Sequence, residues 1–80
     1  MQGNMTNLLE EYEVLIASDV SSRDGIGIEV SFNNELLLEI FRNDSTQKHE
    51  VTLYKKEIPL EVIEACIEKF KKEIPWEYQK

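Results

Sequence analysis

Two glycines spaced one residue apart are the first feature of this sequence that could carry chemistry. They stand in Asp24–Val30, DGIGIEV. Glycine-rich loops that cradle phosphates need a third glycine ahead of a helix, or a Gly-Lys-Ser/Thr ending. Here Val30 occupies the third-glycine position, and apolar and small or polar residues alternate as in a strand. We therefore predict a turn at Asp24-Gly25 that opens a strand, and no nucleotide binding.

The chain has one histidine and one cysteine, His49 and Cys66. His49 stands between Lys48 and Glu50 at the start of a predicted strand, and we expect it to be a solvated edge residue. Cys66 lies among the apolar residues of a predicted helix, which favours a buried structural thiol. A single cysteine forms no intrachain disulfide, so we expect a cytoplasmic protein. We predict no catalytic residue, no cofactor and no metal site.

The charge of the chain is unevenly distributed. Residues 1–46 hold nine acidic and two basic residues, whereas residues 47–80 hold seven of each, so the net charge of −7 belongs to the first half. That half repels a phosphate backbone, which argues against nucleic-acid binding. It attracts a basic protein, although net negative charge also serves solubility alone. No apolar run is long enough for a membrane helix, and no secretory signal is visible.

Five elements are predicted to position these residues in a single domain, 1–80. Asn7 caps a helix to Ala17, with Glu10 at the capping-box spacing and an apolar stripe that includes Leu15 and Ile16. Alternation and turn residues predict three strands, and a stripe after Pro59 predicts a second helix. Their ranges are Ile26–Phe32, Leu36–Arg42, His49–Lys55 and Pro59–Ile74. The expected fold is α+β in the order α-β-β-β-α, a three-stranded antiparallel meander with two helices on one face. Residues 1–6 are expected to be flexible, and the tail 76–80 either packs back or extends.

The register follows from the alternation of the strands. A three-residue turn, Asn33–Glu35, is predicted because it keeps the apolar residues of the first two strands on one face. It places Ile28 opposite Ile40, Val30 opposite Leu38 and Phe32 opposite Leu36. Val51 and Leu53 of the third strand join this helix-covered core if Ile40 pairs with Val51.

The same register predicts the second face of the sheet. Gly27 lies opposite Phe41, whose ring can cover the glycine, and Glu29 lies opposite Glu39. Leu37 and Tyr54 complete an apolar group among carboxylates. Paired glutamates can hold a cation, perform acid–base chemistry, contact a basic partner or simply be exposed.

We predict that this outer face is the partner-binding surface, formed by Glu29, Leu37, Glu39, Phe41 and Tyr54. Its apolar centre supplies affinity and its carboxylates supply steering and specificity. Three alternatives are ordinary cross-strand pairs, cover by Trp76 and Tyr78 of the tail, and a structural homodimer joined through this face.

Three segments, RDGIGIEV, NELLLEIFRND and HEVTLYKKEIPLEVIEACIEKF, span Arg23 to Phe70. Their strand–strand–strand–helix rhythm, Gly-x-Gly start, aromatic-Arg strand end and Ile-Pro-Leu helix start resemble small bacterial immunity proteins of polymorphic toxin systems. The resemblance implies a non-enzymatic inhibitor that occludes a cognate toxin.

Overall fold

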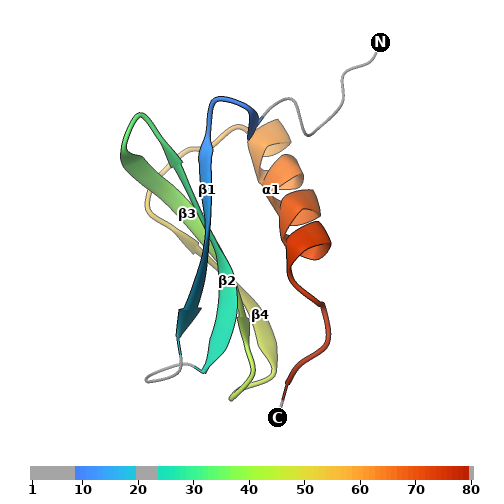
Figure 1. Cartoon of the computed structure of the whole chain (residues 1–80). Coiled ribbons are helices and arrows are strands. Elements are labelled where there is room, and N and C mark those ends of the chain that lie inside the picture. The colour runs from blue at the N-terminus through green and yellow to red at the C-terminus, as the bar shows by residue number, and fades with distance from the viewer. Residues whose placement is uncertain (1–8, 20–23, 80) are drawn as a thin grey trace.

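The computed structural model describes residues 9–19 and 24–79. Within these ranges lie β1 (Glu13–Asp19), β2 (Gly25–Phe32), β3 (Glu35–Asn43), β4 (Lys48–Leu53) and α1 (Leu60–Glu73). The strands form one antiparallel sheet in the order β1-β2-β3-β4, and α1 lies along one face of it (Figure 1). The α+β class and the antiparallel meander are confirmed. In the described part the sheet has four strands and one covering helix, rather than three strands and two helices.

The predicted helix from Asn7 to Ala17 is wrong over its described part; Asn7 and Leu8 lie outside the described residues. A single turn, in which Tyr12 N donates to Leu9 O at 3.0 Å, leads into β1. In β1, Val14 and Ile16 lie opposite Val30 and Ile28 of β2. The run Leu8–Ala17 satisfies a helical stripe, but Val14 and Ile16 also alternate. Pairing decides the conformation, because β1 satisfies the backbone groups that β2 would otherwise leave exposed.

The β2–β3 turn differs from the prediction by one residue. Asn33 and Asn34 have φ of 52° and 65°, the left-handed pair of a two-residue type I′ turn, and Phe32 pairs with Glu35. The pairs Ile28–Ile40 and Val30–Leu38 are nevertheless as predicted. Both hold because the register shifts by one residue beyond Val30, which leaves Leu37 as the extra residue of a β-bulge. The predicted pair of Phe32 with Leu36 is therefore wrong.

The β3–β4 register is as predicted, with Ile40 opposite Val51. Thr52 lies opposite Glu39, and Tyr54 N donates to Leu37 O at 2.8 Å just beyond the ladder. The connection between the strands is closed by the Asn43 side chain, whose Oδ1 accepts from the backbone N–H groups of residues 45 and 46.

The core lies between α1 and the central strands. Its buried residues are Leu9, Ile28, Val30, Leu38, Ile40, Val62, Ala65, Cys66, Phe70 and Ile74. Val51 and Leu53 were expected in this core, but they are 54% and 55% exposed. One helix is about 10 Å wide and strands are about 4.8 Å apart, so α1 covers about two strands, β2 and β3. The helix also begins one residue later than predicted, since Pro59 is its N-cap.

Candidate binding surface

The five residues predicted to form the binding surface do not all lie at the surface. Glu39 and Phe41 are 4% and 1% exposed, and Leu37 is also buried. Glu29 is half-buried, and Tyr54 is exposed. The expectation of an uncovered outer face is therefore wrong at three positions. It followed from placing both predicted helices on the other face of a three-stranded sheet. In the structure β1 adds a fourth strand beside β2, so outward side chains of both β2 and β3 have neighbours on either side.

Phe41 occupies the position opposite Gly27, as the register predicts. Its ring, however, reaches diagonally to Gly25. A Cβ atom on Gly25 would lie 2.8 Å from Cε2 of Phe41, and one on Gly27 would lie 2.1 Å from the carbonyl oxygen of Ile40. The two glycines are thus required because neighbouring atoms occupy the space of a side chain.

Glu29 and Glu39 lie directly opposite each other, as predicted, with Thr52 on the far side of Glu39. Within residues 9–19 and 24–79, no group of three or more histidine, cysteine, aspartate or glutamate side chains is arranged to hold a metal ion.

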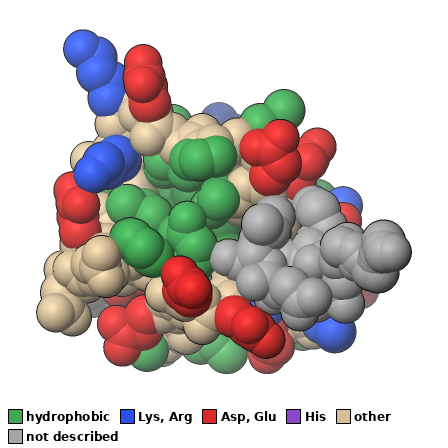
Figure 2. Space-filling model, turned by 90° about the horizontal axis from the view of Figure 1, so that it is seen from above, with side chains coloured by type: hydrophobic (Ala, Val, Ile, Leu, Met, Phe, Trp, Pro, Cys, Tyr) green, Lys and Arg blue, Asp and Glu red, His purple; other side chains and the backbone are tan. Residues whose placement is uncertain are grey.

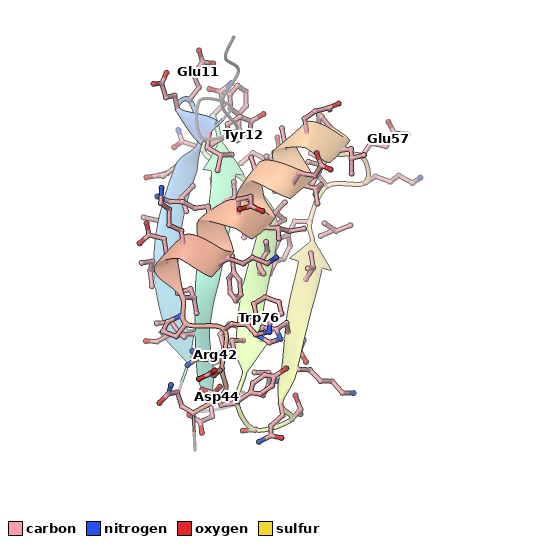
Figure 3. The ribbon with its side chains drawn as sticks, turned by 90° about the vertical axis from the view of Figure 1, so that its right-hand side faces the viewer. Glu11, Tyr12, Arg42, Asp44, Glu57 and Trp76 are labelled. Atoms are coloured by element: carbon pink, nitrogen blue, oxygen red, sulfur yellow. The ribbon has the colours of Figure 1, made fainter. Side chains whose placement is uncertain are left out.

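Exposed apolar side chains lie instead on the two edge strands, Leu15 and Ile16 on β1 and Val51 and Leu53 on β4. Val51 and Leu53 project on the helix side of the sheet, beside α1, and Tyr54 follows them with 55% of its surface exposed. Figure 3 shows α1 crossing in front of the sheet, with most of β4 to one side of it. Sequence reasoning missed this surface because Val51 and Leu53 share their alternation with the core residue Ile40. The signal that could have found this surface is the width of a helix, because a single helix covers about two strands and leaves the next one exposed.

β4 is also an edge strand, and its backbone has a defined free side. Tyr54 N donates to Leu37 O, so even-numbered residues of β4 direct their N–H and C=O groups toward β3. The groups of His49, Val51 and Leu53 consequently point away from the sheet. Among the backbone bonds of the described residues outside the ladders, none involves these groups. The residues with exposed apolar side chains are therefore also the residues that can accept another strand.

The segment after α1 continues past the helix and packs against the connected ends of β3 and β4, where an ion pair holds it. Arg42 binds Asp44 through two bonds, Nε to Oδ1 at 2.9 Å and Nη2 to Oδ2 at 3.2 Å. Arg42 Nη1 also donates to Pro75 O at 2.7 Å, and Gln79 N donates to Asp44 Oδ1 at 3.1 Å. Burial of Asp44 works to raise its pKa, but the hydrogen bonds from Arg42 and Gln79 and the nearby positive charge lower that pKa overall. The tail thus packs back, one of the two outcomes expected for it.

His49 is the second anchor of this segment. Its ring stacks on Trp76, with centroids 3.7 Å apart. Nε2 lies 2.9 Å from Trp76 O, and because a carbonyl oxygen only accepts, Nε2 is the donor. In the neutral ring, Nδ1 then accepts from the hydroxyl of Tyr78, also at 2.9 Å. The expectation of a solvated His49 is wrong, because the tail surrounds the ring and leaves it half-buried.

Cys66 is fully buried in α1, as predicted for a structural thiol. Burial raises the pKa of its thiol from 9.0 to about 11, since the apolar surroundings disfavour the thiolate. A thiol in this state is a poor nucleophile at neutral pH.

The end of the molecule where α1 begins shows hydrophobic side chains in its middle and acidic side chains around them (Figure 2). An open hollow there is lined by Leu9, Glu10, Tyr12, Val14 and Lys69. Its lining contains no nucleophile placed beside a base, and we assign no chemistry to it.

The helix that the structure describes is too short and too polar to cross a membrane. Comparisons with protein-family models, curated proteins and solved structures find no match to this chain.

Proposed function

We propose that this chain is a non-enzymatic protein-binding module that engages its partner through the free edge of β4. The observation that carries the proposal is the coincidence on Val51 and Leu53 of exposed apolar side chains and outward backbone groups. Edge strands of this kind bind extended segments by strand addition, in which backbone bonds supply affinity and alternate side chains supply specificity.

The charge of the chain favours a basic partner. The entire net charge of −7 lies in residues 1–46, which include β1, β2 and β3. The electrostatic field of this negative charge accelerates encounter with a positively charged protein. The exposed apolar strip on β4, formed by Val51 and Leu53, then stabilises the docked complex. The resemblance to immunity proteins is in line with this division, and the specific proposal is that this chain neutralises a cognate toxin by occluding it.

The product of the neighbouring open reading frame is the partner to test. If the proposal holds, that product expressed alone arrests growth, and co-expression of this chain relieves the arrest. The association rate of the two purified proteins falls by about tenfold or more as salt rises from low to physiological levels.

A matched pair of variants locates the binding surface. Leu53→Lys, on β4, is expected to weaken the complex at least tenfold. Leu15→Lys, on the opposite edge strand β1, changes a leucine of similar exposure, 52%, and is expected to leave affinity unchanged. Equal affinities for both variants would show that β4 is not the binding surface. An association rate that does not respond to salt would show that charge does not steer the encounter.

A further inference from the structure

We infer that, without its partner, this chain pairs with a second copy of itself along β4, antiparallel and about a two-fold axis through Thr52. The inference rests on the proposed function in one respect, the capacity of the β4 edge to accept a strand. The second copy is identified by register, side-chain complementarity and charge.

The backbone restricts the registers that are possible. The outward groups belong to His49, Val51 and Leu53, so an added strand must hydrogen-bond at these odd-numbered positions. Two copies of β4 satisfy this requirement when odd residues lie opposite odd residues. The same condition keeps the helix-side residues of both copies on one side of the joined sheet.

Side-chain complementarity selects one of these registers. With Thr52 on the axis, Val51 of each copy lies opposite Leu53 of the other, and each such pair exchanges both backbone bonds. Because the arrangement is symmetric, the two exposed apolar residues of β4 in each copy are covered by the same two residues of the other copy. Shifting the axis to Val51 would place Leu53 opposite His49 instead, which leaves the leucine against a polar ring.

Charge is compatible with this arrangement. The residues that face one another within β4 in this register, Val51, Thr52 and Leu53, are uncharged, so none of these pairs places like charges opposite each other. Lys55 is already bound to Glu35, with Nζ 3.0 Å from Oε1.

The other edge strand is less suited to self-pairing. β1 has Glu13 and Asp19 at its ends, and antiparallel pairing brings the acid of one copy toward the acid of the other. It also belongs to the half of the chain that carries the net charge, whereas β4 belongs to the balanced half.

Sedimentation equilibrium tests the pairing. The apparent mass of the full chain is expected to rise with concentration from the monomer value of 9.4 kDa toward twice that value. Added salt strengthens the association, because it screens repulsion between two acidic chains, and this is the opposite of the salt effect expected for a basic partner. Leu53→Lys weakens self-association at least tenfold, and Leu15→Lys does not weaken it.

A disulfide reports the register. In Thr52→Cys the two thiols face each other at a non-hydrogen-bonded pair, where Cα atoms are about 4.5 Å apart, within disulfide range. Oxidised glutathione is expected to convert this variant to a covalent dimer; the two thiols lose two electrons and two protons, and the oxidant leaves as two reduced glutathiones. Val51→Cys is the control, since its thiols lie on a longer diagonal, and the buried Cys66 does not react.

The outcomes separate the two proposals. A wild-type chain that stays monomeric at millimolar concentration overturns self-pairing, and the proposed function stands if Leu53→Lys still weakens the hetero-complex. Cross-linking of Val51→Cys in preference to Thr52→Cys overturns the register. If Leu53→Lys affects neither complex nor self-association, both proposals fail.

Discussion

The imidazole of His49 stacks on the indole of Trp76 at 3.7 Å, with an angle of 14° between the rings. This contact joins the start of β4 to a residue 27 positions later in the chain. This stack and the hydrogen bonds of Arg42 and Asp44 hold the segment after α1 against β3 and β4. The segment lies on the same face of β4 as the side chain of Val51. Figure 3 shows Trp76 on this segment and Arg42 and Asp44 beside it.

Asp44→Asn is expected to destabilise the fold by about 3 kcal/mol, because it removes the counter-charge of an Arg42 side chain that is 5% exposed. Urea unfolding measures the change, and the fluorescence of Trp76, the one tryptophan of the chain, reports release of the tail. Glu73→Gln is the matched control. It breaks the exposed Lys69–Glu73 pair at 3.0 Å, for which a change below about 0.5 kcal/mol is expected. Similar losses for both variants would contradict a structural role for the Arg42–Asp44 pair.

The stability contributed by Asp44 depends on pH in a defined direction. Its folded-state pKa lies below the ordinary value of 3.8, so the contribution is fully present above pH 3.8 and is lost as the pH falls through the lower folded-state value. Urea midpoints of the wild type and of Asp44→Asn are therefore expected to converge below pH 3.8. Because other carboxylates titrate in both proteins, the difference between the two curves is the quantity to measure. A constant difference down to pH 2 would count against this assignment.

Gly27→Ala is expected to cost about 3 kcal/mol or more, since the new Cβ would meet the Ile40 carbonyl oxygen at 2.1 Å and Phe41 Cα at 2.7 Å. Both are backbone atoms, which cannot move away by changing a rotamer. Ser31→Ala, on the same strand, serves as the control and is expected to change stability by less than about 0.5 kcal/mol. Thermal unfolding followed by circular dichroism compares the stabilities of the two variants. If Gly27→Ala were as stable as the control, β2 and β3 would be able to move apart at this position at little cost.

Asn34→Gly is expected to stabilise the protein by roughly 0.5 kcal/mol, because Asn-Gly is the preferred sequence of a type I′ turn and Asn34 has a φ of 65°. Asn34→Ala, at the same position, is expected to destabilise it by about 1 kcal/mol, the cost of a left-handed conformation for a residue with an unassisted Cβ. Chemical denaturation of the pair gives both values. If alanine and glycine proved equivalent, a three-residue turn in solution would be the better description.

Much of the fold could be predicted because the evidence for it is local. Alternation located β2, β3 and β4 to within two residues, and Pro59 and Pro75 bracketed α1. Apolar matching placed Ile28 opposite Ile40 and Ile40 opposite Val51, which also set Glu29 against Glu39 correctly.

The candidate surface was less predictable, since exposure depends on how many strands and helices surround a residue. Phe41 has the same alternation whether its face is open or closed, and it proved to be 1% exposed. Val51 has the alternation of a core residue, yet no second helix covers it in the described part of the chain.

By itself, then, the sequence determined the central strands, the helix and the distribution of charge, because each depends on neighbours within a few residues. The tertiary structure decided that Glu13–Asp19 is a strand, that Leu37 is a bulge and that β4 bears the exposed apolar strip. The physical reason is that pairing satisfies backbone groups across the whole sheet, and a single helix covers about two of its strands. Neither the pairing of the strands nor their coverage by the helix can be read from the periodicity of a single segment.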